Sequence, residues 1–131
     1  MNNESGKKKI RTFTDLDAWK EAHQLVLIVY TLTKSFPREE VFGLVQQIRR
    51  AVVSISSNIA EGFSRQTYQD KIRFYFMAQG SVTEVQDQLL IARDVAYITP
   101  EDFKRVEQQT IIVHKIVNGL IRGAKNIIRD S

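Results

Sequence analysis

The sequence predicts an all-α protein, an antiparallel up-and-down four-helix bundle. No segment alternates apolar and polar residues in the way that a half-buried strand does. Apolar residues recur instead at spacings of three and four, and start signals divide the chain into four segments joined by short connections, so successive helices should run antiparallel. The expected helices are about 14–35, 37–61, 67–96 and 99–128 in one domain, 13–128, between a basic disordered tail, 1–12, and a C-terminal tail, 129–131.

Capping signals mark the expected helix starts. In a Thr-x-x-Asp pattern the hydroxyl and the carboxylate each accept a backbone N–H at the start of a helix. The pattern occurs three times, as Thr14/Asp17, Thr67/Asp70 and Thr99/Asp102. The second helix is expected to start at Pro37, with Glu39 and Glu40 near its positive end. Gly62 is expected to close this helix as a C-terminal cap, and Pro100 to lie at the start of the last helix.

The second helix is expected to carry an ordered polar row beside its apolar face. The row falls within an arc of about 80° and consists of Gln47, Arg50, Ser54, Asn58 and Glu61. The neighbouring apolar stripe consists of Leu44, Ile48, Ala51, Ile55 and Ile59. One interpretation is an interhelical hydrogen-bond network in which Arg50 pairs with Glu61 or with Glu84 of the third helix. The other is that part of the row lines a channel or a groove for a partner.

The first and last helices have more apolar residues than a small bundle needs. A seam of alternating spacings three and four runs along the last helix through Phe103, Val106, Thr110, Val113, Val117, Leu120, Ala124 and Ile127. Ile112, Ile116 and the flat positions Gly119 and Gly123 fall outside that seam, and the first helix has a wide apolar arc of Leu25, Ile28, Val29 and Leu32. A homo-oligomer would bury such groups, although scattered apolar residues are also common on monomers.

Composition limits the classes of protein that fit. The chain has 131 residues, which suits a single domain, and it contains no cysteine, which excludes disulfides and thiolate metal sites. No apolar run approaches the roughly 20 residues of a membrane span, and the lysine-containing start is not followed by the apolar core of a signal peptide. We therefore expect a cytoplasmic protein without membrane contact.

The positive charge is concentrated at the two ends of the chain. The formal net charge is +4, and residues 1–11 and 120–131 carry more than all of it. A nucleic acid would therefore be met mainly by the ends, with two arginines of the body. The candidate residues are Lys7, Lys8, Lys9, Arg11, Arg49, Arg65, Arg122, Lys125 and Arg129. The alternative is that basic ends only aid solubility.

The sequence contains no recognisable catalytic or metal-binding motif. A di-iron centre in a four-helix bundle needs Glu-x-x-His pairs, and neither His23 nor His114 has a glutamate three residues before it. Glu61 and Glu84 could approach each other across two helices as an acid/base pair, but nearby arginines offer a structural explanation. We therefore expect no enzyme activity, cofactor or metal. His23 is expected in the core or an interface, and His114 beside the seam.

Three segments together resemble a known family. FTDLDAWKEA (13–22), GLVQQIRRAVVSISSNIAEGFSR (43–65) and QGSVTEVQDQLLIARDVAYI (79–98) are similar to the bacterial four-helix bundle family of 23S rRNA intervening-sequence proteins, or S23-type proteins. The resemblance covers about residues 13–125. The matching motif residues are Gln47, Arg50, Ser54, Asn58, Glu61, Gly62, Arg65, Ser81 and Glu84, which we interpret first as fold-defining. Ser56 stands where members commonly have proline, so the helix should run straighter there.

The resemblance implies an assembly and a set of partners. Bundles of this family assemble as rings, typically homopentamers, and the family is similar to the accessory protein of diversity-generating retroelements, a basic barrel that binds nucleic acid and a reverse transcriptase. The leading hypothesis is therefore a non-enzymatic oligomeric scaffold associated with nucleic acid or a ribonucleoprotein. An accessory protein of a reverse transcriptase is one form that such a scaffold could take. A protein-binding adaptor without nucleic-acid contact is the alternative, and an enzyme of unrecognised type is the third.

Overall fold

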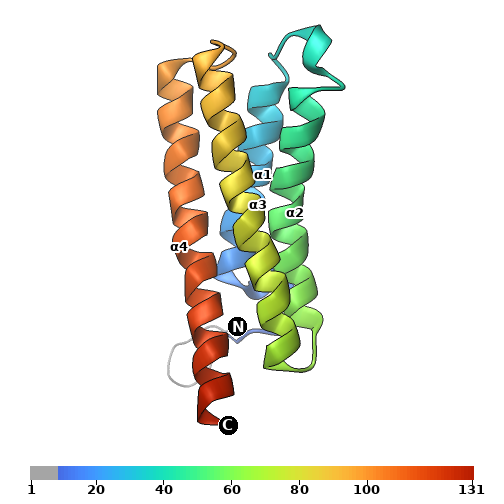
Figure 1. Ribbon diagram of the computed structural model, residues 1–131, viewed down its shortest axis with the longest axis vertical. Coiled ribbons are helices and arrows are strands. Elements are labelled where there is room, and N and C mark those ends of the chain that lie inside the picture. The colour runs from blue at the N-terminus through green and yellow to red at the C-terminus, as the bar shows by residue number, and fades with distance from the viewer. Residues whose placement is uncertain (1–8) are drawn as a thin grey trace.

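The computed structural model describes residues 9–131, and this part of the chain is helical without strands. Four long helices form an antiparallel bundle (Figure 1). They are α1 (Asp17–Thr33), α2 (Leu44–Ser64), α3 (Tyr68–Asp94) and α4 (Pro100–Asp130), with short 3-10 helices η1 (Phe13–Asp15) and η2 (Arg38–Glu40). The start of the described chain, the C-terminal end of α4 and the α2–α3 connection lie at one end of the bundle, the terminal end; the α1–α2 and α3–α4 connections lie at the other, the turn end.

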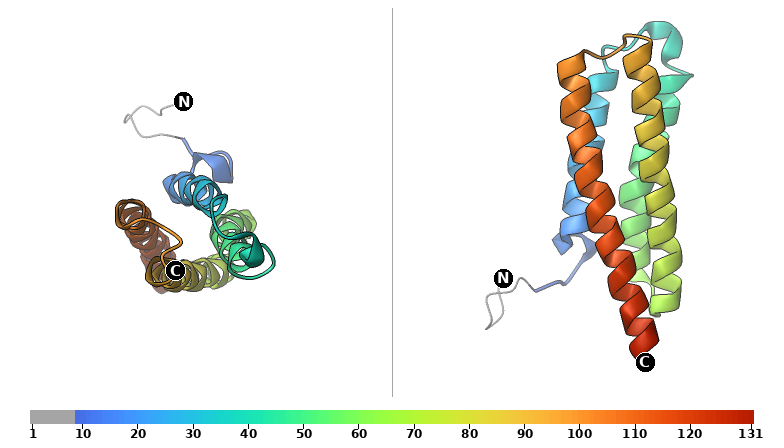
Figure 2. Two further views of the ribbon diagram at one scale, coloured as in Figure 1. Left: turned by 90° about the horizontal axis from the view of Figure 1, so that it is seen from above. Right: turned by 60° about the vertical axis from the view of Figure 1, so that its left-hand side comes forward.

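Each helix packs against two neighbours around the bundle. α1 contacts α2 and α4, and α3 contacts α2 and α4 (Figure 2). The side chains that meet inside follow the helical spacings expected from the sequence. Ile48, Ile55 and Ile59 of α2 are fully buried, and so are Val113 and Val117 of α4. Burying each such side chain contributes about 1.5–3 kcal/mol, so the sequence pattern accounts for the core that holds the four helices together.

The single bundle buries more of the apolar side chains of α1 than the sequence indicates. Leu25 and Val29 are fully buried, and Ile28 and Leu32 pack against the core at its edge. The expectation that a single bundle would expose all four is therefore wrong for Leu25 and Val29, because α1 packs against both α2 and α4. The seam of α4 is confirmed through Val117 and at Ala124, but Ile121 rather than Leu120 is the buried residue between them, and Ile127 is exposed.

The second helix starts later than expected. After buried Phe36 the chain makes the short helix η2 and a turn, and α2 begins only at Leu44, so Pro37 does not start it. Oε1 of Glu40 accepts a hydrogen bond from the Leu44 backbone N–H at 3.1 Å, and Oε2 accepts one from the Tyr97 hydroxyl at 2.7 Å. These bonds lower the pKa of the Glu40 carboxyl. Phe36 also packs on the Tyr97 ring, so tertiary contacts fix where α2 begins.

Gly62 lies inside α2 and is not its cap, because α2 continues to Ser64. A Cβ at this position would lie 2.6 Å from the ring of buried Tyr75, so glycine allows α2 and α3 to approach closely. The end of α2 is satisfied by Lys71, whose ammonium donates to the Phe63 carbonyl at 2.6 Å and to the Gly62 carbonyl at 3.4 Å. Burial lowers the pKa of Lys71.

Two of the three threonine caps are confirmed. The Thr67 hydroxyl accepts from the Asp70 N–H, and the Thr99 hydroxyl from the Asp102 N–H. The third is wrong: a carboxylate oxygen of Asp15 accepts from the Thr12 N–H, which starts η1, and α1 begins at Asp17. The last helix extends to Asp130, so nearly all of the expected C-terminal tail is helical. Within residues 9–131, no helix combines the length and apolarity that crossing a membrane requires.

Candidate nucleic-acid interface

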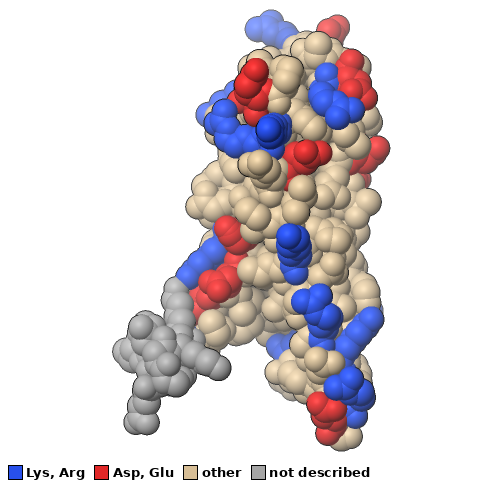
Figure 3. Space-filling view, turned by 90° about the vertical axis from the view of Figure 1, so that its left-hand side faces the viewer, with Lys and Arg blue, Asp and Glu red and all other residues tan. Residues whose placement is uncertain are grey.

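The second half of α4 exposes a basic surface at the terminal end. Lys115, Arg122, Lys125 and Arg129 are all exposed, and the helix has no acidic residue between Glu107 and Asp130. Figure 3 shows lysine and arginine side chains gathered toward the C-terminal end of this helix. We call these four residues the α4 basic surface.

The core seam determines the direction of these side chains. Val113, Val117, Ile121 and Ala124 are buried against the bundle, whereas the four basic residues, spaced by seven, three and four positions, lie together on another side of the helix that is exposed. Cations near the C-terminus of a helix also interact favourably with its partial negative charge. The α4 basic surface is therefore compatible with a stable helix, and its charges remain available to an anion.

Aromatic rings lie beside some of these cations. The Lys125 ammonium lies 5.2 Å from the centre of the Phe76 ring, whose residue is 49% exposed. Arg65, in the α2–α3 connection at the same end, lies 4.4 Å from the Phe74 ring and forms an exposed ion pair with Glu61 at 3.1 Å. Because exposed pairs contribute little, the Arg65–Glu61 contact can be exchanged for a phosphate at small cost.

The remaining candidate residues are distributed unevenly. Lys9 and Arg11 lie in the segment before η1, at the terminal end. Lys7 and Lys8 lie outside the described residues. Arg49 lies near the turn end, far along α2 from Arg65. Its Nε donates to the Thr33 hydroxyl at 2.9 Å. The structure thus brings most of the candidate cations to one end and places Arg49 in a different site.

The polar row of α2 divides into a bonded part and an exposed part. The Ser81 hydroxyl donates to the Ser54 hydroxyl across α2 and α3 at 2.9 Å, and the Asn58 amide donates to the same hydroxyl at 3.0 Å. Four other residues assigned to this network are exposed: Gln47, Arg50, Glu61 and Glu84. Within the described chain Arg50 pairs with neither carboxylate, because it points outward and Glu61 pairs with Arg65.

The two histidines lie in structural surroundings. The His23 ring is half-buried and stacks on Trp19, with ring centres 4.7 Å apart. His114 belongs to a polar cluster between α3 and α4 that the sequence did not reveal, in which the Gln79 amide donates to Asn118 Oδ1 and to the His114 carbonyl. Among the described residues, no group of three or more histidine or acidic side chains could hold a metal ion.

Known proteins resemble the chain in sequence and in fold. The family model described as 23S rRNA-intervening sequence protein matches residues 14–119. A crystal structure of a protein of unknown function from the S23 ribosomal protein family of Bacteroides thetaiotaomicron is similar with a TM-score of 0.73 and 22% identity. The match covers 80% of this chain and 95% of that one, and at this identity it shows the fold alone. No curated protein sequence matches the chain.

Proposed function

The chain belongs to the 23S rRNA-intervening sequence protein family, and on that premise we propose that it is a non-enzymatic homo-oligomeric scaffold that binds nucleic acid at its terminal end. The observation that carries this proposal is the α4 basic surface, where four exposed cations follow one another without an intervening acid. Such a surface favours phosphates, and binding would release counterions and depend steeply on salt. Within residues 9–131, no element suited to reading base edges in a groove accompanies it, so little preference for sequence is expected.

Assembly into a ring, which we propose to be a homopentamer, would strengthen such binding. Large apolar side chains are exposed in adjacent pairs on the outer faces of α3 and α4: Leu90 and Ile91, and Ile111 and Ile112. Contact between copies would remove these groups from water. Each copy would add one basic surface, and several linked surfaces bind a long polyanion much more tightly than one. Light scattering should give about five times the chain mass of 15.1 kDa; a monomeric particle would contradict the assembly.

A protein-binding adaptor is the alternative function. The same exposed apolar pairs could bind another protein instead of a second copy. A reverse transcriptase, which the resemblance to retroelement accessory proteins suggests, would be a partner of the nucleic-acid-binding scaffold, whereas the adaptor would bind its protein partner without contacting nucleic acid. Loss of binding to nucleic acid with retained binding to such a protein would favour the adaptor.

The test compares two triple variants with the same change in charge. R122Q/K125Q/R129Q removes three cations of the α4 basic surface, and R38Q/K104Q/R105Q removes three exposed cations at the turn end. Binding of labelled RNA and DNA is measured by fluorescence anisotropy across a salt series. We expect the first variant to lose most of the affinity and to flatten the salt dependence, and the second to stay close to wild type. Equal losses, or no wild-type binding at about 50 mM salt, would contradict nucleic-acid binding at the terminal end.

A further inference from the structure

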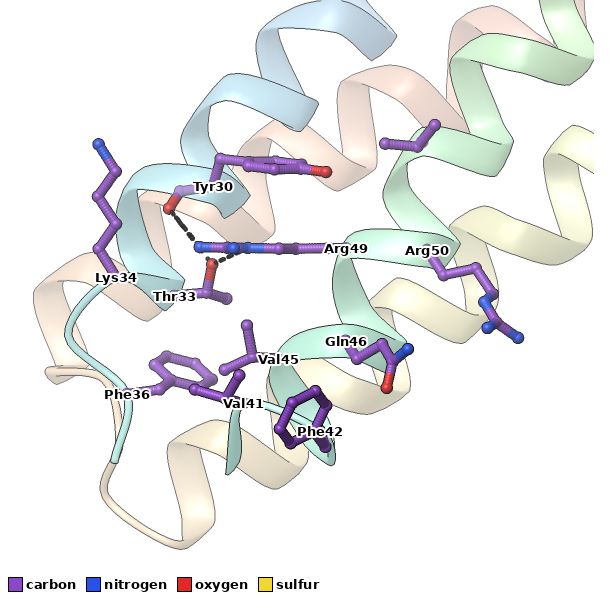
Figure 4. A pocket seen from close by; sticks show the side chains of 11 residues that line it. Tyr30, Thr33, Lys34, Phe36, Val41, Phe42, Val45, Gln46, Arg49 and Arg50 are labelled. Carbon is purple, nitrogen blue, oxygen red and sulfur yellow. Dashed lines mark hydrogen bonds between the residues drawn. The ribbon is translucent and has the colours of Figure 1, made fainter. Parts of the chain in front are cut away.

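A second surface with cations and aromatic rings lies at the turn end, apart from the α4 basic surface. A groove of about 620 Å³ opens between the end of α1 and the start of α2 (Figure 4). Lys34, Arg49 and Arg50 line it, and none of the described residues that line it is acidic. An unneutralised set of three cations favours an anionic occupant.

Arg49 is held in a fixed orientation inside this groove. Its guanidinium lies 4.6 Å from the centre of the Tyr30 ring, and its Nη2 donates to the Tyr30 carbonyl at 3.4 Å while Nε donates to the Thr33 hydroxyl. Figure 4 shows the side chain extending from α2 toward α1, with Tyr30 on one side and Val45 on the other. Its Nη1 group has no protein acceptor among the described residues. A guanidinium that is already ordered loses little entropy when it binds a phosphate.

Phe42 adds an aromatic surface beside the cations. Its residue is 88% exposed, the highest value among the large apolar residues of the described chain. It lies in the turn before α2, on the side of the groove opposite Tyr30 (Figure 4). An aromatic ring left open to solvent beside arginines is the arrangement on which bases of single strands stack.

We propose that this groove binds one or two nucleotides of a single-stranded nucleic acid, with a base on Phe42 and phosphates on Arg49 and Arg50. The proposal rests on the proposed function and adds a base-dependent site to it. An acidic peptide fits less well, because an apolar anchor needs an apolar hole, and the Arg49 guanidinium lies between Tyr30 and Val45 of the apolar lining. Lys34 and Arg50 stand at the two edges, where a strand would enter and leave.

The test separates the contribution of bases from that of phosphates. Full-length protein is titrated with labelled dT12 and with an abasic oligonucleotide of the same length and charge. We expect dT12 to bind about fivefold tighter or more, because stacking on an aromatic side chain adds affinity that an abasic strand lacks. Phe42→Ser should remove this difference and leave the abasic strand unaffected. Arg50→Gln should weaken both strands, and Val95→Ser, which alters a half-exposed apolar residue at the same end, should change neither.

Three results would overturn the proposal. These are equal binding of dT12 by wild type and Phe42→Ser, a changed oligomer mass for Phe42→Ser, and displacement of dT12 by an acidic phenylalanine-containing peptide at equal concentration. The second would make the groove an interface between copies. R122Q/K125Q/R129Q should weaken the binding of dT12 and of the abasic strand by the same factor. The effect of this variant tests the terminal-end proposal, and the effect of Phe42→Ser tests the groove, so the two proposals can fail separately.

Discussion

The two ends of the bundle are closed in different ways. At the terminal end Gly62 brings the backbones of α2 and α3 together, and Lys71 covers the last carbonyls of α2. At the turn end the connections are joined by side chains, since the Tyr97 hydroxyl donates to Glu40 and the Tyr97 ring packs on Phe36. Packing at the terminal end therefore requires that Gly62 has no side chain, whereas packing at the turn end requires the side chains of Phe36, Glu40 and Tyr97.

This difference also separates the two candidate sites. At the terminal end α2 and α3 pack closely at Gly62, and the α4 basic surface lies on the outside of one helix. At the turn end the longer α1–α2 connection, with η2 and the exposed Phe42, leaves the groove open between two helices. A surface on one helix can be deduced from spacing along the sequence, whereas a groove built from a connection requires the tertiary structure.

Gly62→Ala should have the largest effect on stability. The added Cβ would lie 2.6 Å from the Tyr75 ring and 3.2 Å from the Lys71 carbonyl oxygen, so α2 and α3 must move apart. Overpacking of this kind costs about 1–3 kcal/mol, and only part of it is offset by the better helix propensity of alanine. Urea denaturation should show a lower midpoint.

Gly80→Ala is the matched control for this prediction. Gly80 also lies in a helix, but a Cβ there would meet nothing within 4 Å. Alanine should then stabilise the protein by about 0.5–1 kcal/mol through helix propensity alone. If both variants shift the midpoint in the same direction, close approach at Gly62 does not determine the packing of the terminal end.

The threonine caps should be equivalent at the two ends. Thr67 starts α3 at the terminal end and Thr99 starts α4 at the turn end, and each hydroxyl accepts one backbone N–H, at 3.2 and 3.1 Å. Thr67→Ala and Thr99→Ala should each cost about 1 kcal/mol, because a cap depends on local geometry. Thermal unfolding of both variants measures this. A difference above about 1 kcal/mol would show that the ends differ even in their local capping.

The sequence predicts the parts of the fold that depend on local patterns. The four helices, the core positions of α2 and α4, and the caps at Thr67 and Thr99 follow from spacing and hydrogen-bonding chemistry. The start of α2 and the role of Gly62 could not be predicted, because they depend on Tyr97 and Tyr75, which are distant in sequence. A glycine near a helix end gives the same signal whether it caps the helix or allows close packing.

The candidate sites follow the same division. The cations of Arg122, Lys125 and Arg129 were identified from charge alone, and the helix places them together. Arg49 was assigned to the same surface, but its partners Tyr30 and Thr33 come from another helix and place it in the groove. The positions of charged residues in the sequence therefore predict a basic surface only when those residues lie on the same helix.

Ala96→Gly should stabilise the turn end. Ala96 follows α3 with φ of 64°, the left-handed conformation that favours glycine, and the Tyr97 N–H donates to the Ala92 carbonyl at 2.8 Å in a Schellman arrangement. Relief of this strain exceeds the entropy that glycine adds to the unfolded chain, so a gain of about 0.5–1 kcal/mol is expected. Denaturation midpoints measure it, and no gain would mean that the connection relaxes around alanine.

Tyr97→Phe should have the smallest effect at neutral pH and the most informative pH dependence. It removes the hydrogen bond to Glu40 and keeps the ring on Phe36. That bond is the main cause that lowers the pKa of Glu40 and raises the pKa of Tyr97. The Glu40 contribution to stability is present above the ordinary carboxyl pKa and is lost as pH falls. The Tyr97 contribution is present below the ordinary phenol pKa and is lost as pH rises.

The melting temperatures of wild type and Tyr97→Phe should therefore differ most between about pH 5 and pH 9 and converge on either side. Tyr68→Phe is the control at the terminal end, because the Tyr68 ring is near Lys71 while its hydroxyl has no described hydrogen bond; its difference from wild type should stay flat over the same range. A flat difference for Tyr97→Phe would mean that ring packing alone closes the turn end. The two ends would then differ only in which side chains cover them, and the connection beside the groove would not respond to pH.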